Sequence, residues 1–352
     1  MRKRLAAAVG VASVVGALAL RERWQRQQDQ RHFAAGRDYW RRYLSADTLG
    51  WADDHVKTLR IPAGNIGIHL DVYARPETNA PVIVLAHGML TYGKLYLPLV
   101  QAFFARGYTV ISPDFPGNGF SGGTRGDNTA GETAAALVET TLWARQRYDG
   151  PLYLFGMGLG GPVAYAAAVA GAPVSAIACI DLFTFDDQAA LRRVFTHPRL
   201  ADLLPATRVL AKAFGWVRIP VQWVHRVDQI VAPTESASLA FWRVDPLVPR
   251  VISLRSLVSA ANTPPAVGLE HNKVPTLVIN QGKEHVLDPT VTRASYDRLG
   301  GPKRYVELAS SDHWSFAPAF SATIADACDA WFRAYHAGTT PQEPAGRTRL
   351  AR

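Results

Sequence analysis

Between residues 80 and 183 the chain alternates continuously apolar runs with helical patterns, and this alternation restricts its fold more than any other feature. The runs APVIVLA, YTVISP, PLYLFG and VSAIACI carry no charged residue, which is typical of strands covered on both faces. Helical patterns such as GETAAALVETTLWARQRY lie between them. Strands that alternate with helices imply right-handed crossovers and parallel pairing. We therefore expect an α/β fold with a mostly parallel sheet of about eight strands flanked by helices.

The alternation lapses between residues 184 and 272 and resumes with the strand-like run VPTLVINQG. The lapse contains several helix-like pieces and three tryptophans, Trp216, Trp223 and Trp242. Ligands bind at the carboxyl edge of parallel sheets, so an insertion there is expected to form a helical cap or lid, with a simple extension of the core as the alternative. The expected division of the chain is a basic N-terminal segment (1–42), a core (43–183 and 273–336), the cap insertion (184–272) and a disordered tail (337–352).

The formal net charge of +9 is confined to the two ends of the chain. Residues 1–42 hold ten Lys and Arg against three Asp and Glu, and residues 337–352 hold three Arg against Glu343. The remaining residues are formally neutral. A neutral globular body offers no electrostatic surface for tracking phosphates, so nucleic acid is not expected as a partner.

The N-terminal sequence MRKRLAAAVGVASVVGALALRERW has a basic start followed by sixteen uncharged residues, Leu5 to Leu20. A helix of that length spans about 24 Å, short of the ~30 Å hydrocarbon layer. A signal peptide, a short or tilted membrane anchor and an ordinary helix are the alternatives. We favour an uncleaved single-pass anchor, because arginines directly after Ala17-Leu18-Ala19 are unfavourable for cleavage. The protein would then be membrane-associated, or exported if the segment is cleaved.

Four motifs follow strand-like runs in a fixed order: His87-Gly88-Met89, DFPGNGFSGG (114–123), FGMGLGG (155–161) and Ser311-Asp312-His313-Trp314. The third motif joins an apolar strand to an alanine-rich helix, which is the setting of a nucleophile elbow, G-x-S-x-G, whose middle residue attacks the substrate. The middle residue here is Gly158, which has no side chain.

Together with the segment WRVDPLVP (242–249), these motifs resemble the α/β-hydrolase fold. They are most similar to the serine-aminopeptidase-like branch that contains monoacylglycerol lipases and lysophospholipases, over about residues 55 to 336. The resemblance implies a carboxylic ester with a lipid-like acyl group as substrate or ligand. It also implies an oxyanion hole formed by the backbone N–H groups of Met89 and Leu159.

The resemblance further implies that His313 is the general base and that His87, Gly88 and Met157 contact the substrate. A carboxylate must fix the tautomer of such a base. The family usually carries Asp three residues after the glycine of VPTLVINQG, where this chain has His285. Allowing one deleted residue aligns the following VLDP with the family pattern and makes Glu284 the counterpart, which we prefer. Asp288 and Asp181 are the alternatives.

The glycine at position 158 has three explanations. In the first, the reaction is lost. In the second, a displaced nucleophile acts, and the candidates are Thr91, Tyr92, Ser121 and Ser315. In the third, water held by His313 attacks the substrate directly. We therefore expect either a weak or altered ester hydrolase or a non-catalytic relative that binds an acyl ligand or a protein partner. The sequence contains no metal-ligand cluster or dinucleotide fingerprint, so no cofactor is expected, and Cys179 and Cys328 are expected as buried thiols.

Overall fold

The computed structural model describes residues 37–225, 235–283, 286–336 and 348–350. The chain divides into two compact units, residues 1–42 and 43–352. In the first unit the described part is a 3-10 helix, η1 (Arg37–Arg42). The expected anchor, Leu5 to Leu20, lies outside the described residues and stays a prediction. Within the described ranges, no helix is both long and apolar enough to cross a membrane.

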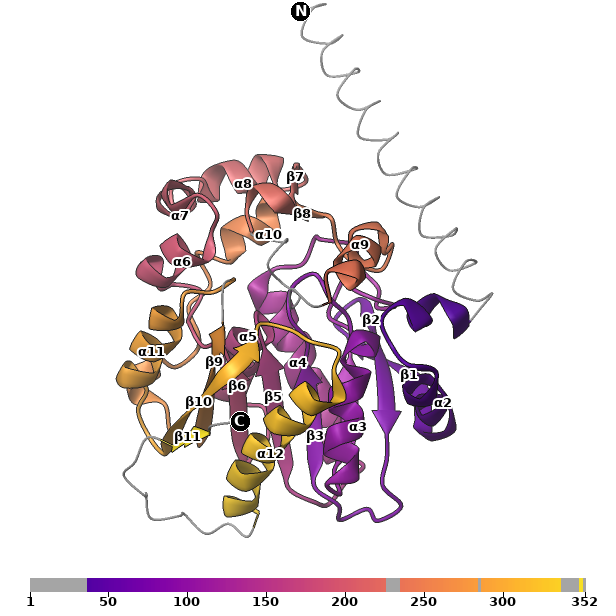
Figure 1. Ribbon diagram of the computed structural model, residues 1–352. Coiled ribbons are helices and arrows are strands. Elements are labelled where there is room, and N and C mark those ends of the chain that lie inside the picture. The colour runs from indigo at the N-terminus through magenta and orange to yellow at the C-terminus, as the bar shows by residue number, and fades with distance from the viewer. Residues whose placement is uncertain (1–36, 226–234, 284–285, 337–347, 351–352) are drawn as a thin grey trace, which may run out of the picture. The chain divides into compact units, whose positions relative to one another are not determined.

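A mostly parallel sheet forms the centre of the second unit, in the order β1-β2-β4-β3-β5-β6-β9-β10-β11 (Figure 1). Its strands are β1 (Val56–Ala63), β2 (Ile66–Tyr73), β3 (Val82–Ala86), β4 (Thr109–Pro113), β5 (Leu152–Met157), β6 (Ala176–Ile180), β9 (Thr276–Lys283), β10 (Lys303–Asp312) and β11 (Thr348–Leu350). The first two strands pair antiparallel as a hairpin, β2 is antiparallel to β4, and the remaining pairs are parallel. The predicted α/β fold is therefore confirmed. The short edge strand β11 comes from the tail that was expected to be disordered.

The central strands β3, β4, β5 and β6 are buried at every residue, as their continuously apolar sequences predict. The covering helices are α2 (Ala46–His55), η2 (Gly93–Tyr96), α3 (Leu97–Ala105), α4 (Ala130–Arg145), α5 (Gly160–Val169), α11 (Pro289–Arg298) and α12 (Pro318–Ala334). Helices α3 and α12 pack side by side on one face, and α4 and α5 lie on the other (Figure 1). Thr129 begins α4 with a capping box, since its hydroxyl accepts from the Glu132 N–H while the Glu132 carboxylate accepts from the Thr129 N–H.

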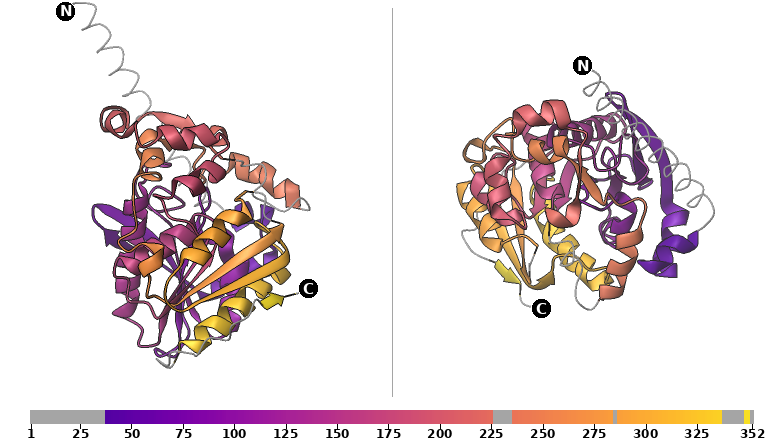
Figure 2. Two further views of the ribbon diagram at one scale, coloured as in Figure 1. Left: turned by 90° about the vertical axis from the view of Figure 1, so that its left-hand side faces the viewer. Right: turned by 90° about the horizontal axis from the view of Figure 1, so that it is seen from above.

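The segment between β6 and β9, called the insertion here (184–272), lies over the carboxyl ends of the central strands (Figures 1 and 2). It contains α6 (Gln188–Val194), α7 (Pro198–Leu203), α8 (Arg208–Phe214), β7 (Arg218–Pro220), η3 (Val221–Trp223), α9 (Ser236–Val244), β8 (Val251–Ser253), α10 (Leu254–Ser259) and η6 (Leu269–His271). Strands β7 and β8 form a separate antiparallel pair.

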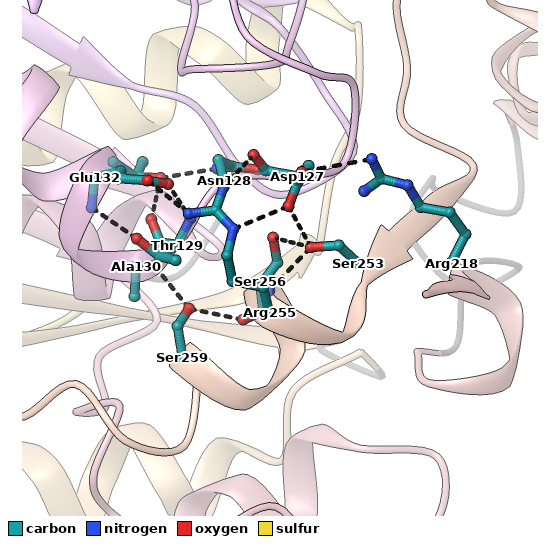
Figure 3. Close-up of polar contacts among 11 residues, drawn as sticks. Asp127, Asn128, Thr129, Ala130, Glu132, Arg218, Ser253, Arg255, Ser256 and Ser259 are labelled. Atoms are coloured by element: carbon teal, nitrogen blue, oxygen red, sulfur yellow. Dashed lines mark hydrogen bonds and ion pairs between the residues drawn. The ribbon is translucent and has the colours of Figure 1, made fainter. Parts of the chain in front are cut away.

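Polar contacts around Asp127 fasten the insertion to the loop before α4, and we call this cluster the Asp127 junction (Figure 3). The Asp127 carboxylate accepts from the Ser253 hydroxyl at 2.6 Å and from Arg255 Nε at 3.2 Å, and it lies 3.5 Å from a guanidinium nitrogen of Arg218. Arg255 also pairs with Glu132 at 2.6 Å. Burial alone would raise the pKa of the Asp127 carboxyl, but the Ser253 hydroxyl and the two arginines together lower that pKa below its ordinary value.

Candidate active site

The loops after β3, β5, β6 and β10 meet around one cavity below the insertion. Gly88, Met89, Thr91, Tyr96, Met157, Gly158, Leu159, Asp181 and His313 line it from the core, and Val194 and His225 line it from the insertion. It has a volume of about 760 Å³ including its open mouth. An adjoining chamber of about 830 Å³, which also includes its open mouth, shares Gly88, Met89, Leu90, Leu159 and Phe183 with it, so the two spaces lie side by side.

The corner between β5 and α5 consists of Gly158 and Leu159, with Gly158 in the left-handed region at φ +58°. A Cβ atom built on Gly158 would lie 3.7 Å from both Cε1 and Nε2 of His313, which is ordinary van der Waals contact. The flanking glycines are different, since a Cβ on Gly156 or Gly160 would lie 2.1 or 2.0 Å from a backbone oxygen. Close packing therefore excludes a side chain beside the corner but leaves room for one at position 158.

His313 directly follows β10, and the Gln281 side chain holds its loop by donating to the carbonyls of Asp312 and His313 at 2.6 and 3.1 Å. The His313 side chain is 14% exposed, and its Nδ1 lies 3.8 Å from Oδ2 of Asp181. Asp181 follows β6 with φ +65°, a backbone conformation that Asp adopts more readily than most residues. The structure thus brings together His313, Asp181 and Gly158 from three separate strand ends.

The turn after β3 carries Met89, whose neighbours are tightly held. The Gly88 N–H donates to the Tyr96 hydroxyl at 2.8 Å, and Leu90, at φ +62°, accepts at its carbonyl from Trp242 Nε1 of the insertion at 2.7 Å. Met89 and Leu159 both line the two chambers. Within the described part of the chain, neither of their backbone N–H groups donates to a protein acceptor.

His87, Gly88 and Met157 were all expected to contact the substrate. Gly88 and Met157 line the cavity, but His87 does not. It is fully buried, and its Nε2 accepts from the Phe115 N–H at 2.9 Å. Nδ1 therefore carries the proton and donates to the Gly88 carbonyl at 2.8 Å. Burial lowers the pKa of this imidazole to about 4, so it is neutral near pH 7. His87 supports the Gly88 turn from behind.

Of the other two acid candidates, only Asp288 lies in the part of the chain that the structure describes. Asp288 caps α11 by accepting from the Thr290 N–H at 2.9 Å, and it pairs with Arg193 at 2.9 Å. The hydrogen bond from the Thr290 hydroxyl is the main cause that lowers the pKa of the Asp288 carboxyl. Glu284, which the sequence favoured, lies outside the described residues, so its role stays a prediction.

The candidate displaced nucleophiles bond elsewhere. The hydroxyls of Tyr92, Ser121 and Ser315 donate to Asp245, the Asp114 carbonyl and Glu235 at 2.9, 2.6 and 2.7 Å. Thr91 lines the cavity, but its hydroxyl donates to the Gly88 carbonyl at 2.8 Å. These hydrogen bonds therefore leave none of the four hydroxyl groups positioned to act as a nucleophile.

Sequence reasoning missed the contacts that join the insertion to the turn after β3. Asp245 is fully buried and accepts from the hydroxyls of Tyr92 at 2.9 Å and Tyr43 at 3.3 Å. Trp242 and Asp245 both belong to the WRVDPLVP segment, which was quoted only as part of a family pattern. His225, which lines both chambers, lies in a stretch without helical or strand periodicity, so no sequence signal pointed to it.

Cys179 and Cys328 are buried free thiols, and burial raises the pKa of both. Over the described ranges, no group of three or more His, Cys, Asp or Glu side chains is arranged to hold a metal ion.

Comparison with known proteins identifies a family and several proteins to which this chain is similar. The model of the family described as serine aminopeptidase, S33, matches residues 77–313. A curated Escherichia coli protein, described as an uncharacterised 31.7 kDa protein in the traX-finO intergenic region, is 24% identical over 285 residues, which cover 78% of this chain and 94% of that protein. Among solved structures, Paleococcus ferrophilus monoacylglycerol lipase is 19% identical with a TM-score of 0.59, covering 76% of this chain and 99% of that one. A soluble variant of Saccharomyces cerevisiae monoglyceride lipase, in complex with a substrate analogue, is 16% identical with a TM-score of 0.62, covering 81% and 96%.

Proposed function

Because this chain belongs to the serine aminopeptidase S33 family of α/β hydrolases, we propose that its cavity binds a lipid-like carboxylic ester. We further propose that His313 deprotonates a water molecule, which attacks this ester directly. The observation that carries this proposal is the 3.7 Å distance between a Cβ built on Gly158 and the His313 imidazole. A serine at that position would adjoin the base. With glycine there, the space that a serine side chain would fill adjoins Nε2 of His313 and can admit the attacking water.

The backbone contribution to the reaction does not depend on the absent side chain. Met89 and Leu159 line the cavity, and their backbone N–H groups have no protein acceptor in the described residues, so these groups can stabilise the oxyanion of a tetrahedral intermediate. Leu159 also precedes the first turn of α5, whose dipole favours negative charge. Asp181 is the acid that we propose to orient His313, since its carboxylate lies 3.8 Å from Nδ1.

The proposed reaction is slow. Loss of a catalytic serine lowers turnover about a million-fold, and an oxyanion hole with bound substrate retains roughly a thousand-fold over water. The water, deprotonated by His313, would attack the ester carbonyl, and the same imidazole would return the proton to the leaving alcohol. No covalent acyl-enzyme would form.

The substrate class follows from the lining of the site. The second chamber contains the aromatic side chains of Phe115, Phe183, Phe185 and Phe195, which suit an apolar acyl chain. We propose that the insertion acts as the cap, because Val194, Val221 and His225 contribute to the chamber walls. Its shape would then limit the length of the chain that binds.

A second candidate function is binding of an acyl ligand without turnover. The observation that favours it is the lack of a poised hydroxyl: the Thr91 hydroxyl, on the cavity wall, is already engaged with the Gly88 carbonyl. In that case the cavity would be retained as a ligand pocket.

Short-chain p-nitrophenyl esters separate the two functions. We expect slow turnover by the purified chain that is lost in His313→Ala. Equal rates for the two proteins would contradict the water mechanism and favour the binding function.

Gly158→Ser tests the geometry behind both functions. We expect the variant to react covalently with a fluorophosphonate probe and to exceed the wild-type esterase rate by on the order of a hundredfold or more. Addition of Asp181→Asn should then slow labelling, because the tautomer of His313 would no longer be fixed. A folded Gly158→Ser protein that resists the probe would show that position 158 is not the place of a nucleophile.

A further inference from the structure

Exposed large apolar side chains are concentrated on the insertion. Those on α7, α8, η3 and their connections, called the outer patch here, are Leu203, Val209, Leu210, Phe214, Trp216 and Trp223, and each is between 46% and 75% exposed. In the rest of the described chain, the large hydrophobic side chains of comparable exposure are Leu142 at 40% and Val244 at 59%. Clustered exposure of this kind marks an interaction surface.

Helix α8 displays this apolar surface because it packs on only one side. The backbone N–H groups of Leu254 and Arg255, at the start of α10, donate to the carbonyls of Val217 and Gly215 at 2.8 and 3.1 Å. Helix α8 has no buried residue, and Figure 1 shows it above α10, on the side away from the sheet. At 100° per residue, positions 209, 210, 213 and 214 fall within an arc of about 140° on that outward side.

Basic side chains border the apolar arc. Arg208 and Lys212 are exposed and lie four residues apart on α8, about 100° and 60° around the helix from the near edge of the arc, and Arg199 is exposed on α7. Among the described residues, none of these three side chains forms an ion pair, whereas Asp202, the acidic residue of the stretch, pairs with Arg192 at 2.6 Å. The segment 198–225 contains Arg199, Arg208, Lys212 and Arg218 against Asp202, a formal charge of +3. The surface is therefore both apolar and cationic.

The outer patch is the outer side of a segment whose inner side lines the cavity. Trp223 is 61% exposed, while Val221 of the same 3-10 helix and His225 line the second chamber. Whatever covers the outer patch at Trp223 thus lies within one helical turn of residues that line the cavity.

We propose that the outer patch docks on an anionic lipid bilayer, with Phe214, Trp216 and Trp223 entering the boundary between headgroups and acyl chains. Tryptophan and phenylalanine next to exposed arginine and lysine are the composition of a surface that lies in that boundary, since the rings are amphipathic and the cations attract acidic headgroups. A second copy of this chain fits less well, because a self-pairing contact would bring Arg208 and Lys212 of both copies together. The proposal stands whether or not the cavity is catalytic.

Quenching of tryptophan fluorescence by brominated phosphatidylcholine tests this contact in the full chain. The vesicles contain phosphatidylcholine and phosphatidylglycerol at a ratio of about 7 to 3, which gives an anionic surface. We expect wild-type protein to be quenched and the variant Trp216→Gln/Trp223→Gln to lose the larger part of the quenchable signal. Leu142→Gln is the matched control, since it removes an exposed apolar side chain from α4 and should leave quenching unchanged. The N-terminal segment is the same in all three proteins, so its own contribution cancels.

A charge variant provides a second measurement. Arg208→Gln/Lys212→Gln should weaken binding to the anionic vesicles by about fivefold for each charge removed and leave binding to pure phosphatidylcholine vesicles unchanged. Equal quenching of wild type and the double tryptophan variant would overturn the proposal. So would a wild-type dimer in light scattering that the tryptophan variant converts to a monomer, because that result would make a second copy the occupant of the patch.

Discussion

The corner around Gly158 lines the first chamber and the neighbours of Asp127 line the second, but the corner and the Asp127 junction are held together by opposite means. The corner depends on contact between backbones, and from β5 into α5 a Cβ on Gly156 or Gly160 would lie 2.1 or 2.0 Å from a carbonyl oxygen. The junction depends on charged side chains, with Asp127 between Arg218 and Arg255 (Figure 3). Tightly packed backbones have few alternative arrangements, whereas partly exposed ion pairs respond to pH and salt. The corner is thus rigid, whereas the contacts that fasten the insertion depend on solution conditions.

The largest expected effect breaks the corner. In Gly160→Ala the new Cβ would lie 2.0 Å from the Ala86 carbonyl oxygen, so β3 and α5 must separate. We expect the free energy of unfolding to fall by about 3 kcal/mol or more. Gly158→Ala is the matched control, because its Cβ has room and only the left-handed backbone is strained, at about 1 kcal/mol. Urea denaturation measures both, and similar losses in the two variants would contradict a corner built by close packing.

The next effect is a pH dependence of stability that arises from His87, which supports the Gly88 turn. Burial lowers the pKa of His87 to about 4 in the folded protein, against 6.5 in the unfolded chain. The unfolded state therefore binds a proton that the folded state excludes, and stability present above pH 6.5 is lost as pH falls toward 4. The loss amounts to about 3 kcal/mol by the lower pH.

His87→Gln removes this titration. The variant is expected to be less stable at pH 7, where the imidazole bonds are missing, but to lose less of its remaining stability on acidification. Thermal unfolding measured at several pH values gives the comparison. Parallel pH profiles for the variant and wild type would show that His87 is not held neutral.

The smallest effect tests the junction. Asp127→Asn keeps the shape of the side chain but removes its charge from between Arg218 and Arg255, and we expect a loss of about 1 to 2 kcal/mol that shrinks at high salt. Because the folded pKa of Asp127 is lowered, this stabilisation is present above the ordinary value of 3.8 and is lost below it. Asp202→Asn removes an exposed pair with Arg192 and should change nothing measurable. A salt-independent loss in Asp127→Asn would contradict an electrostatic junction.

The sequence predicted the sheet well, because each central strand carries its own signal. Runs such as VIVLA and LYLFG are buried at every residue, and a run of that kind is recognisable from a few neighbours. The strand-end motifs were also located correctly in the chain, and Gly88, Met89, Gly158 and His313 line one cavity. The insertion was predicted as a helical cap or lid but without the bounds of its elements, since its short helices lack long periodic stretches.

The same sequence reasoning named Asp181 only as an alternative acid, although the structure places its carboxylate beside His313. Asp181 lies 3.8 Å from His313 although 132 residues separate them, and Asp288 is engaged with Arg193. The contribution of Trp242 to the Leu90 carbonyl likewise joins residues 152 positions apart. Such proximities follow from how the strands and the insertion pack, and no local pattern reports them.

By itself, the sequence determined that this chain builds a mostly parallel α/β sheet, that its four motifs stand at strand ends and that position 158 has no side chain. These are properties of short segments, fixed by apolar runs, by glycine and by the chemistry of single residues. Only the tertiary structure decided that a side chain would fit at 158, that Asp181 adjoins His313 and that one side of the insertion faces the cavity while the other carries exposed apolar residues. Those depend on distances between segments that meet only when the sheet is assembled, because packing rather than sequence neighbourhood sets them.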